Sequence, residues 1–481
     1  MMLRKIKLAL LFPFILSCTK DVGVLSNGSS YPKEIAEILL TRCSVSGCHN
    51  AASKGAASGL SLENWEAAFN GSRGGAIIIP FRPDFSTLCY YTNSFTDLGP
   101  SLEPRMPVNQ EPLTRADYLK LSNWIKNGAP DNKGFIKFSN SLNKLYVTNQ
   151  LCDIVTVLDA ATKLPMRYVN VGILPKTEFP VCIKLSPDKK YWYVSFLASG
   201  ILQKFDAATD TYSEQADLGE GSWSSFELTG DSKFAFCIDN NSSGRIAYVD
   251  LLEMKVITYY SHTDFVYSRS AAIHNTLKKL YTGTESGNYI SVLDFMNPVS
   301  PLIKQVILDG SQLLDHTSSL DPVFLYLEES LNLCIVACRG SKEIKLLDTR
   351  KDSIIRSIYL GASPSSMDFV KSQKKVLVTC TDDSLSFPEN MGSVKIVDVA
   401  SGQIVKIINP GYQPNGICVN EAMNYAAVVN SNISPKGPRP HHTSACSGRN
   451  GYVTFIDLKT MELIPNIKYE LAVYPYAIAL R

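Results

Sequence analysis

The chain has 481 residues, of which 45% are hydrophobic, and its formal net charge at pH 7 is +2. A chain of this length is expected to form more than one domain, with enough apolar residues for a sizeable core. Lysine and arginine are spread along the sequence, whereas a nucleic-acid partner requires a concentrated basic surface. The composition therefore argues against nucleic-acid binding.

The N-terminus has the character of an export signal. Three cationic residues precede an apolar stretch that is too short to span a bilayer. That stretch ends in I-L-S-C and resembles a bacterial lipobox, which implies that Cys18 is acylated. An ordinary signal peptide with an incidental cysteine is the alternative. We expect a lipoprotein signal peptide over residues 1–17, a flexible tether over residues 18–30, and a lipid anchor in the bacterial cell envelope, facing the periplasm or the cell surface.

Residues 43–49 read C-S-V-S-G-C-H and place His49 directly after the second of two cysteines. Three chemistries compete for Cys43, Cys48 and His49. A zinc site needs about four ligands, and no second Cys/His pair follows at a suitable spacing. A Cys43–Cys48 disulfide is sterically possible but leaves the histidine unexplained. The third chemistry is covalent haem, whose usual signal is C-x-x-C-H, although here four residues separate the cysteines instead of two.

The flanking sequence favours the haem interpretation. Ile35, Ile38 and Leu39 have the spacing of one helical face, which predicts a helix before the motif. A second helix is predicted to begin at a cap formed by Thr114 and to stop at Gly128.

Met106 lies between these two helices, in the sequence E-P-R-M-P-V-N. A thioether in the loop before the closing helix is well placed to ligate iron, and a Met/His ligand pair raises the reduction potential. Packing within the loop is the alternative role for Met106.

Several short stretches of this region resemble a known family. C-S-V-S-G-C-H, G-L-S-L-E-N-W, I-I-P-F-R-P-D-F-S-T-L, R-M-P and W-I-K-N-G-A are similar to the small class I-type cytochrome c domains of bacterial surface and periplasmic proteins. The resemblance covers about residues 31–131 and implies a small all-α cytochrome c domain with one covalent haem c. It implies that Cys43 and Cys48 attach the haem and that His49 and Met106 ligate its iron.

From residue 135 onward, a phrase of two hydrophobic residues followed by aspartate recurs about every 44 to 59 residues. Seven repeats of this period, each with about four short strands, predict an all-β seven-bladed propeller over residues 135–481. Y-V-T-N at residues 146–149 resembles the YVTN family of propeller repeats. Each aspartate is predicted to accept backbone N–H groups in the turn before the outer strand. These residues are Asp159, Asp206, Asp250, Asp294, Asp348, Asp398 and Asp457.

The C-terminal residues and two insertions also have predicted places in the ring. Residues 474–480 match the start of a blade and are predicted to pair with the first blade, which removes an open sheet edge. Blades six and seven carry insertions at residues 381–393 and 430–451, each between the second and third strands. Both insertions should therefore lie on one face, and such a face often binds a partner.

The second insertion holds His441, His442 and Cys446, which are candidates for a copper or zinc site. A solvated loop is the alternative. The chain has 12 cysteines. Several of those outside the haem motif lie in strand-like runs, where a buried thiol packs as a small hydrophobic group, so no disulfide is predicted.

We interpret the chain as a lipid-anchored, extracytoplasmic c-type cytochrome that transfers electrons through a His/Met-ligated haem. The propeller would serve as a platform for a redox partner protein or a small-molecule ligand. One alternative is a haem-dependent oxidoreductase with a substrate or second metal site on the propeller face, for which only fold analogy gives precedent. Another alternative is a non-redox binding lipoprotein.

Overall fold

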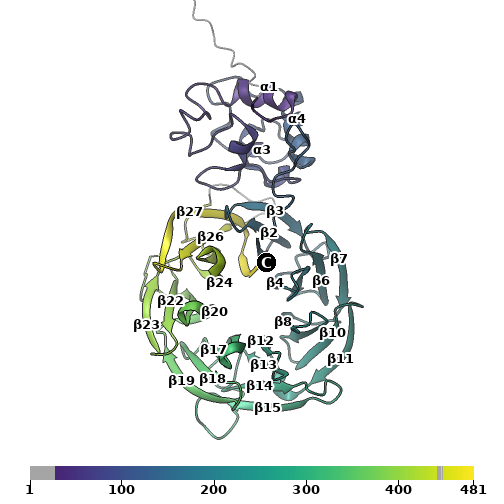
Figure 1. Ribbon diagram of the computed structural model, residues 1–481, viewed down its shortest axis with the longest axis vertical. Coiled ribbons are helices and arrows are strands. Elements are labelled where there is room, and N and C mark those ends of the chain that lie inside the picture. Colours follow the sequence, from purple (N-terminus) through teal and green to yellow (C-terminus); the bar gives the residue numbers. More distant parts are fainter. Residues whose placement is uncertain (1–27, 390, 441–445, 447) are drawn as a thin grey trace, which may run out of the picture.

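The computed structural model describes residues 28–389, 391–440, 446 and 448–481. It consists of an N-terminal unit, residues 28–143, and a ring of seven four-stranded sheets. The N-terminal unit lies on the outer rim of the ring, beside β3 and β27 (Figure 1). No helix in the described ranges is long and apolar enough to cross a membrane.

The N-terminal unit contains four short α-helices and one 3-10 helix, joined by irregular chain. They are α1 (Lys33–Arg42), α2 (Trp65–Phe69), η1 (Pro83–Phe85), α3 (Thr87–Thr92) and α4 (Arg115–Lys126). The two helices predicted around the haem motif are confirmed as α1 and α4. In α4, the side chain of Thr114 accepts the Asp117 N–H as the expected cap, and Gly128 follows the helix at φ +95°.

The sequence predicted a separate all-α cytochrome c domain followed by a propeller. The prediction of the all-α domain is wrong. The described chain is nearly all β, and its four α-helices have only 10, 5, 6 and 12 residues. The two longer helices, α1 and α4, stand at the two ends of the unit. Between them, six prolines over residues 80–112 interrupt helical hydrogen bonding. The resemblance of short stretches to a known family therefore did not predict the fold of the whole unit.

The seven-bladed propeller is confirmed. The first three sheets consist of β28 (Pro475–Leu480), β1 (Lys144–Asn149), β2 (Ile154–Asp159) and β3 (Pro165–Asn170); β4 (Pro180–Leu185), β5 (Tyr191–Phe196), β6 (Ile201–Asp206) and β7 (Tyr212–Asp217); and β8 (Trp223–Leu228), β9 (Phe234–Asp239), β10 (Arg245–Asp250) and β11 (Lys255–Ser261).

The remaining four sheets follow in chain order. They consist of β12 (Ser268–His274), β13 (Lys279–Thr284), β14 (Tyr289–Asp294) and β15 (Leu302–Ile307); β16 (Pro322–Glu328), β17 (Leu333–Cys338), β18 (Glu343–Asp348) and β19 (Ser353–Tyr359); β20 (Ser363–Val370), β21 (Lys375–Asp382), β22 (Ser393–Asp398) and β23 (Gln403–Ile408); and β24 (Pro414–Asn420), β25 (Tyr425–Asn430), β26 (Asn450–Asp457) and β27 (Glu462–Val473). Short 3-10 helices at η2 (Thr263–Phe265), η3 (Glu329–Leu331), η4 (Lys371–Gln373) and η5 (Glu421–Met423) occupy connecting turns.

The recurring aspartates have the predicted structural role. Each ends the third strand of its blade, and its carboxylate accepts a backbone N–H two or three residues later. Asp206, for example, accepts the Thr209 N–H at 2.8 Å, and Asp457 accepts the Thr460 N–H at 2.8 Å. These backbone hydrogen bonds hold the pKa of both carboxyl groups below its usual value, against the opposing effect of burial. The same turn is formed in all seven blades.

The ring closes as predicted, because β28 from the C-terminus pairs antiparallel with β1. The Ala477 N–H also donates to the Thr148 hydroxyl at 3.0 Å. Both long insertions lie between the second and third strands of their blades, from β21 to β22 and from β25 to β26, as predicted.

A buried ion pair joins the first two blades. The ammonium group of Lys144 in β1 lies 2.7 Å from the carboxylate of Asp210 in the turn between β6 and β7. The Tyr146 hydroxyl donates to the same carboxylate at 3.1 Å. Lys279, Tyr281 and Asp352 form a matching arrangement between the fourth and fifth blades. In both cases the aspartate stands four residues after a recurring aspartate, which is a sequence signal for this contact.

We expect Asp210→Ala to lower the free energy of unfolding by about 3–5 kcal/mol, because the substitution leaves the Lys144 ammonium buried without its counter-charge. The exposed Glu253 provides the control, and Glu253→Ala should change stability by less than about 0.5 kcal/mol. Urea unfolding followed by circular dichroism measures both. Equal unfolding midpoints for the two variants would show that the buried pair contributes nothing to blade association.

Candidate N-terminal cofactor cavity and propeller channel

The C-S-V-S-G-C-H segment forms a tight loop directly after α1. Cys43 is the C-cap of α1, and its N–H donates to the Leu39 carbonyl. The His49 N–H then donates back to the Cys43 carbonyl at 3.0 Å, and the His49 carbonyl accepts the Leu62 N–H at 2.8 Å. Gly47, at φ +81°, allows the reversal between them. The loop thus fixes the backbone of His49 on both sides.

The structure brings Cys43, His49 and Met106 to the wall of one cavity of about 490 Å³. Met106 reaches the cavity from a separate loop, which is held to α3 because the Met106 N–H donates to the Tyr91 carbonyl at 2.7 Å. Cys48 is half-buried and does not line the cavity.

Most of the remaining wall is apolar or aromatic, with a few hydroxyl groups and one arginine. From the N-terminal unit it includes Leu60, Leu62, Arg73, Ile77, Ile79, Phe85, Leu88, Tyr91 and Thr92. The propeller contributes Pro165 and Tyr168 from β3 and Glu470 from β27. The cavity is therefore shared by the two parts of the chain.

Burial shifts the pKa of two groups of the motif, His49 and Cys43. It lowers the pKa of His49, with a smaller opposing effect from the backbone of Leu60, so the imidazole is neutral at physiological pH. Its Nδ1 atom is buried and has no hydrogen-bond partner among the described residues. Burial also raises the pKa of the Cys43 thiol to about 12, with Arg42 lowering it and Cys48 raising it by smaller amounts.

These features fit a haem better than the two competing chemistries. Cys43 and Cys48 are both free thiols. Within the described ranges, no group of three or more His, Cys, Asp or Glu side chains is arranged to hold a metal ion, as zinc would require. A neutral imidazole and a thioether on an apolar wall are the kinds of ligand and surroundings that a haem would require. Of the four predicted haem-binding residues, Cys48 is the one that the structure does not bring to the cavity.

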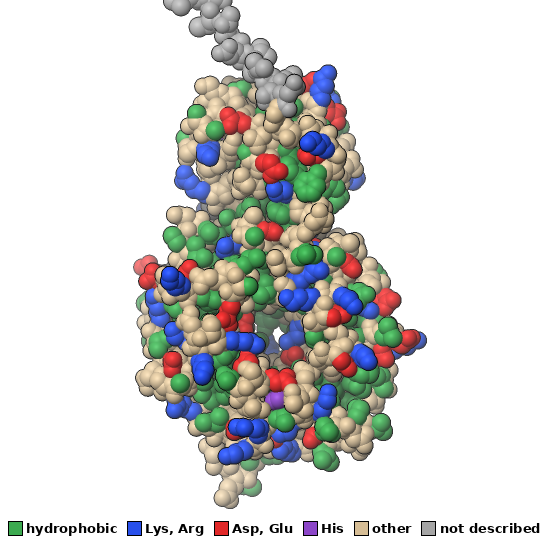
Figure 2. Space-filling view, viewed as in Figure 1, with side chains coloured by type: hydrophobic (Ala, Val, Ile, Leu, Met, Phe, Trp, Pro, Cys, Tyr) green, Lys and Arg blue, Asp and Glu red, His purple; other side chains and the backbone are tan. Residues whose placement is uncertain are grey.

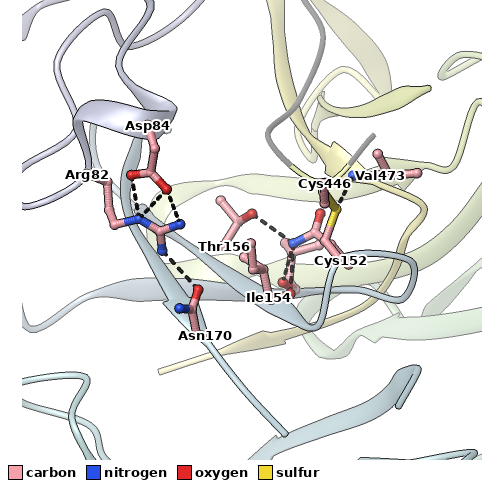
Figure 3. Close-up of a disulfide and its surroundings, with 10 residues drawn as sticks. Arg82, Asp84, Cys152, Ile154, Thr156, Asn170, Cys446 and Val473 are labelled. Carbon is pink, nitrogen blue, oxygen red and sulfur yellow. Dashed lines mark hydrogen bonds and ion pairs between the residues drawn. A yellow bond between two sulfur atoms is a disulfide. The ribbon is translucent and has the colours of Figure 1, made fainter. Parts of the chain in front are cut away.

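The second candidate metal site loses one of its three ligands. Cys446 forms a disulfide with Cys152, so it has no thiolate to offer a metal ion (Figure 3). His441 and His442 lie outside the described residues, as does Cys18. The oxidoreductase interpretation depended on this site and is correspondingly weakened.

The disulfide was not predicted, and it crosses the seam at which the ring closes. Cys152 lies in the loop between β1 and β2, and Cys446 lies in the insertion of the seventh blade, 294 residues later. The Cys152 sulfur also accepts the Val473 N–H at 3.3 Å. In the chain-entropy account, a link closing so long a loop stabilises the fold by on the order of 5 kcal/mol. The available signal was that neither cysteine lies in a strand, unlike the buried free thiols Cys237 and Cys334.

A second cavity, of about 480 Å³, occupies the centre of the ring and is lined by the innermost strands. Charged side chains surround its opening (Figure 2). Lys184 and Glu227 pair within it at 2.8 Å, and Arg269 reaches the Tyr476 hydroxyl at 2.9 Å. Burial raises the pKa of Asp368 to about 6. The channel therefore combines charged and apolar side chains, whereas the N-terminal cavity is mainly apolar.

No known family model matches the sequence. Antigen Lp49 of Leptospira interrogans serogroup Icterohaemorrhagiae serovar copenhageni (strain Fiocruz L1-130) is 33% identical over 106 residues, which cover 19% of this chain and 22% of that protein. The match thus spans about a fifth of the relative's length. Among solved structures, a functionally unknown protein from Desulfotomaculum acetoxidans DSM 771 has a TM-score of 0.51 and 14% identity, covering 70% of this chain and 98% of that chain.

Hydrazine synthase of Kuenenia stuttgartiensis has a TM-score of 0.48 and 14% identity, covering 64% of this chain and 93% of that chain. At these identities, likeness to solved structures bears on the fold alone. Fold and site together define a seven-bladed propeller protein with an N-terminal cavity that gathers a cysteine, a histidine and a methionine.

We expect Cys43 in the haem-free protein to react with iodoacetamide at pH 8 at least about tenfold more slowly than Cys48, because only the thiolate is nucleophilic and Cys43 is buried with a raised pKa. Mass spectrometry of the peptides over a time course measures both rates in one sample. Equal rates would contradict the burial of Cys43 in the cavity wall.

Proposed function

We propose that the chain binds one covalent haem c in the N-terminal cavity and acts as an extracytoplasmic electron carrier. The observation that carries this proposal is the meeting of Cys43, His49 and Met106 on one cavity wall, although Met106 stands far from the other two in the sequence. When bound, a haem would supply reversible uptake and release of a single electron. The proposal concerns the site and does not require an all-α cytochrome fold.

Each residue of the site has a defined part in the proposal. His49 would ligate the iron through its neutral imidazole, which burial keeps unprotonated. Met106 would offer a thioether as a second ligand to the iron, which would raise the reduction potential. Cys43 and Cys48 would form the thioether links, which prevent loss of the haem. The apolar wall would keep water from the iron.

The propeller would provide the docking surface for a redox partner protein or a small polar ligand. Its channel supports the second role, because paired and unpaired charges line a volume of about 480 Å³. The same observation favours a second candidate function, that of a non-redox binding lipoprotein. The local similarity to a protein named as an antigen is compatible with that candidate. Haem attachment separates the two candidates.

We further propose that the mature protein is anchored to the bacterial cell envelope through an acylated Cys18. Support comes from the I-L-S-C sequence at the end of the apolar stretch. The anchor would hold the site at a membrane surface on the periplasmic or outer side, where a redox partner could be reached.

The haem proposal is tested by expressing the protein with a haem-maturation system. We expect a c-type spectrum, haem retained by the denatured chain, and a Met–iron charge-transfer band that disappears in Met106→Ala. The control is Met296→Ala, whose side chain is 71% exposed on the propeller and which should keep the band. Folded protein without haem would exclude the electron carrier and leave the binding lipoprotein.

The anchor proposal is tested by Cys18→Ser in a bacterial host that is labelled with radioactive palmitate. We expect loss of the label and a shift of the protein from the membrane fraction to the soluble fraction, because no acyl chain remains to partition into lipid. Ser26→Ala, in the same stretch, should retain both. An unlabelled wild-type protein would show that Cys18 is not acylated.

A further inference from the structure

We infer that the outer edge of the propeller, and Tyr168 in particular, forms one wall of the N-terminal cavity. As a positioning residue, Tyr168 controls how much water reaches the interior of the cavity. The inference rests in part on the proposed haem function, but it also applies to the cavity without a cofactor. It gives the propeller a role at the site that neither the sequence nor the comparisons assign.

The first support is an aromatic contact across the two parts of the chain. The ring of Tyr168 in β3 stacks on Phe85 of the N-terminal unit, with centroids 4.2 Å apart and planes inclined by 20°. Both residues line the cavity. Burial raises the pKa of Tyr168. The contact therefore forms a continuous aromatic surface on one side of the cavity.

The second support is a clamp formed by Arg82. Its guanidinium lies 4.4 Å from the centroid of the Phe85 ring and donates to the Tyr168 carbonyl at 2.7 Å and to the Asn170 amide oxygen at 3.1 Å. Asp84 holds the same guanidinium at 2.7 Å (Figure 3). Arg82 thus fixes the stacked pair from the side of the N-terminal unit.

A further contact involves the seventh blade. The backbone at Gly75 approaches Tyr469 of β27 so closely that a Cβ atom on this glycine would lie 3.4 Å from the tyrosine ring. Glu470, the next residue of β27, lines the cavity. The wall therefore spans both blades that meet at the closure of the ring.

The Cys152–Cys446 disulfide packs against the residues of this wall. Ile79, Phe85, Ile154 and Ala472 form one buried apolar cluster, and Tyr168 and both disulfide cysteines pack against it. Since Cys152 belongs to the first blade and Cys446 to the seventh, their bond limits the separation of the two edges that form the wall. The wall should accordingly be rigid.

The consequence for the site follows from solvent access. Water near a haem stabilises the more highly charged oxidised state, whereas an apolar wall disfavours it and raises the reduction potential. Removing the Tyr168 ring should open the wall next to Phe85. We expect a lower reduction potential in the haem-loaded protein and a more reactive Cys43 in the haem-free protein.

The test compares Tyr168→Ala, Tyr168→Phe and wild type in the full chain. In the haem-free protein without added reductant, N-ethylmaleimide should modify Cys43 about tenfold faster in Tyr168→Ala than in wild type. Loss of the ring opens a path for the reagent and, because it exposes the Cys43 thiol to water, lowers the raised pKa of that thiol. Cys48 in the same sample is the internal reference. Tyr168→Phe keeps the ring and should react like wild type. Tyr359→Ala, an outer-strand tyrosine of the fifth blade with 67% exposure, is the matched control.

The haem-loaded proteins provide an independent measurement. The reduction potential should fall in Tyr168→Ala and remain at the wild-type value in Tyr168→Phe and Tyr359→Ala. If Tyr168→Ala does not fold, Arg82→Ala removes the clamp instead and should accelerate Cys43 modification in the same direction. An unchanged Cys43 rate in a folded Tyr168→Ala protein would overturn the inference. Absence of haem would instead overturn the proposed function, because the Cys43 rates still report on the wall.

Discussion

The pairing of β28 with β1 is the contact on which the rest of the structure depends. Without it, the first blade would lack its innermost strand and the inner edge of β1 would be unpaired. Three kinds of contact stabilise the closure of the ring. They are the backbone hydrogen bonds between β28 and β1, the Ala477–Thr148 hydrogen bond and the Cys152–Cys446 disulfide. The N-terminal unit rests on the outer strands of the two blades that meet there. Closure of the ring therefore also assembles one side of the N-terminal cavity.

The features predicted correctly are those that local sequence determines. The recurring aspartates were predicted because a carboxylate that accepts N–H groups two and three residues later needs only a short turn. Thr114 and Gly128 likewise mark the ends of α4 through contacts within a few residues. The strand count and the closing strand follow from the repeat period. The closing pair of β28 and β1 is the one long-range contact among them, and it was predictable because the repeat pattern leaves the first blade one strand short.

The predictions that failed depended on long-range contacts or on the extension of a short motif. The all-α domain was inferred from stretches that resemble a family, but the proline-rich chain between residues 80 and 112 forms mostly irregular structure. Cys152 and Cys446 stand 294 residues apart, and only the closed ring brings them together. At the site, Cys43 and His49 were identified from their motif and Met106 from its place in the loop before the closing helix, whereas Tyr168 belongs to an outer strand whose sequence gives no sign of the neighbouring unit.

The two cavities of the molecule are suited to different kinds of ligand. They have similar volumes, about 490 and 480 Å³, but the lining of the N-terminal cavity is more apolar and that of the channel carries more charged side chains. The N-terminal cavity is mainly apolar and keeps His49 neutral, which suits a flat, hydrophobic cofactor and is unfavourable for a solvated ion. The channel contains Lys184, Glu227 and Asp368, which would impose a desolvation penalty on an apolar occupant and favour a polar one. The two cavities would therefore suit different ligands at separate places, and the wall formed by β3 and β27 is where the propeller borders the N-terminal cavity.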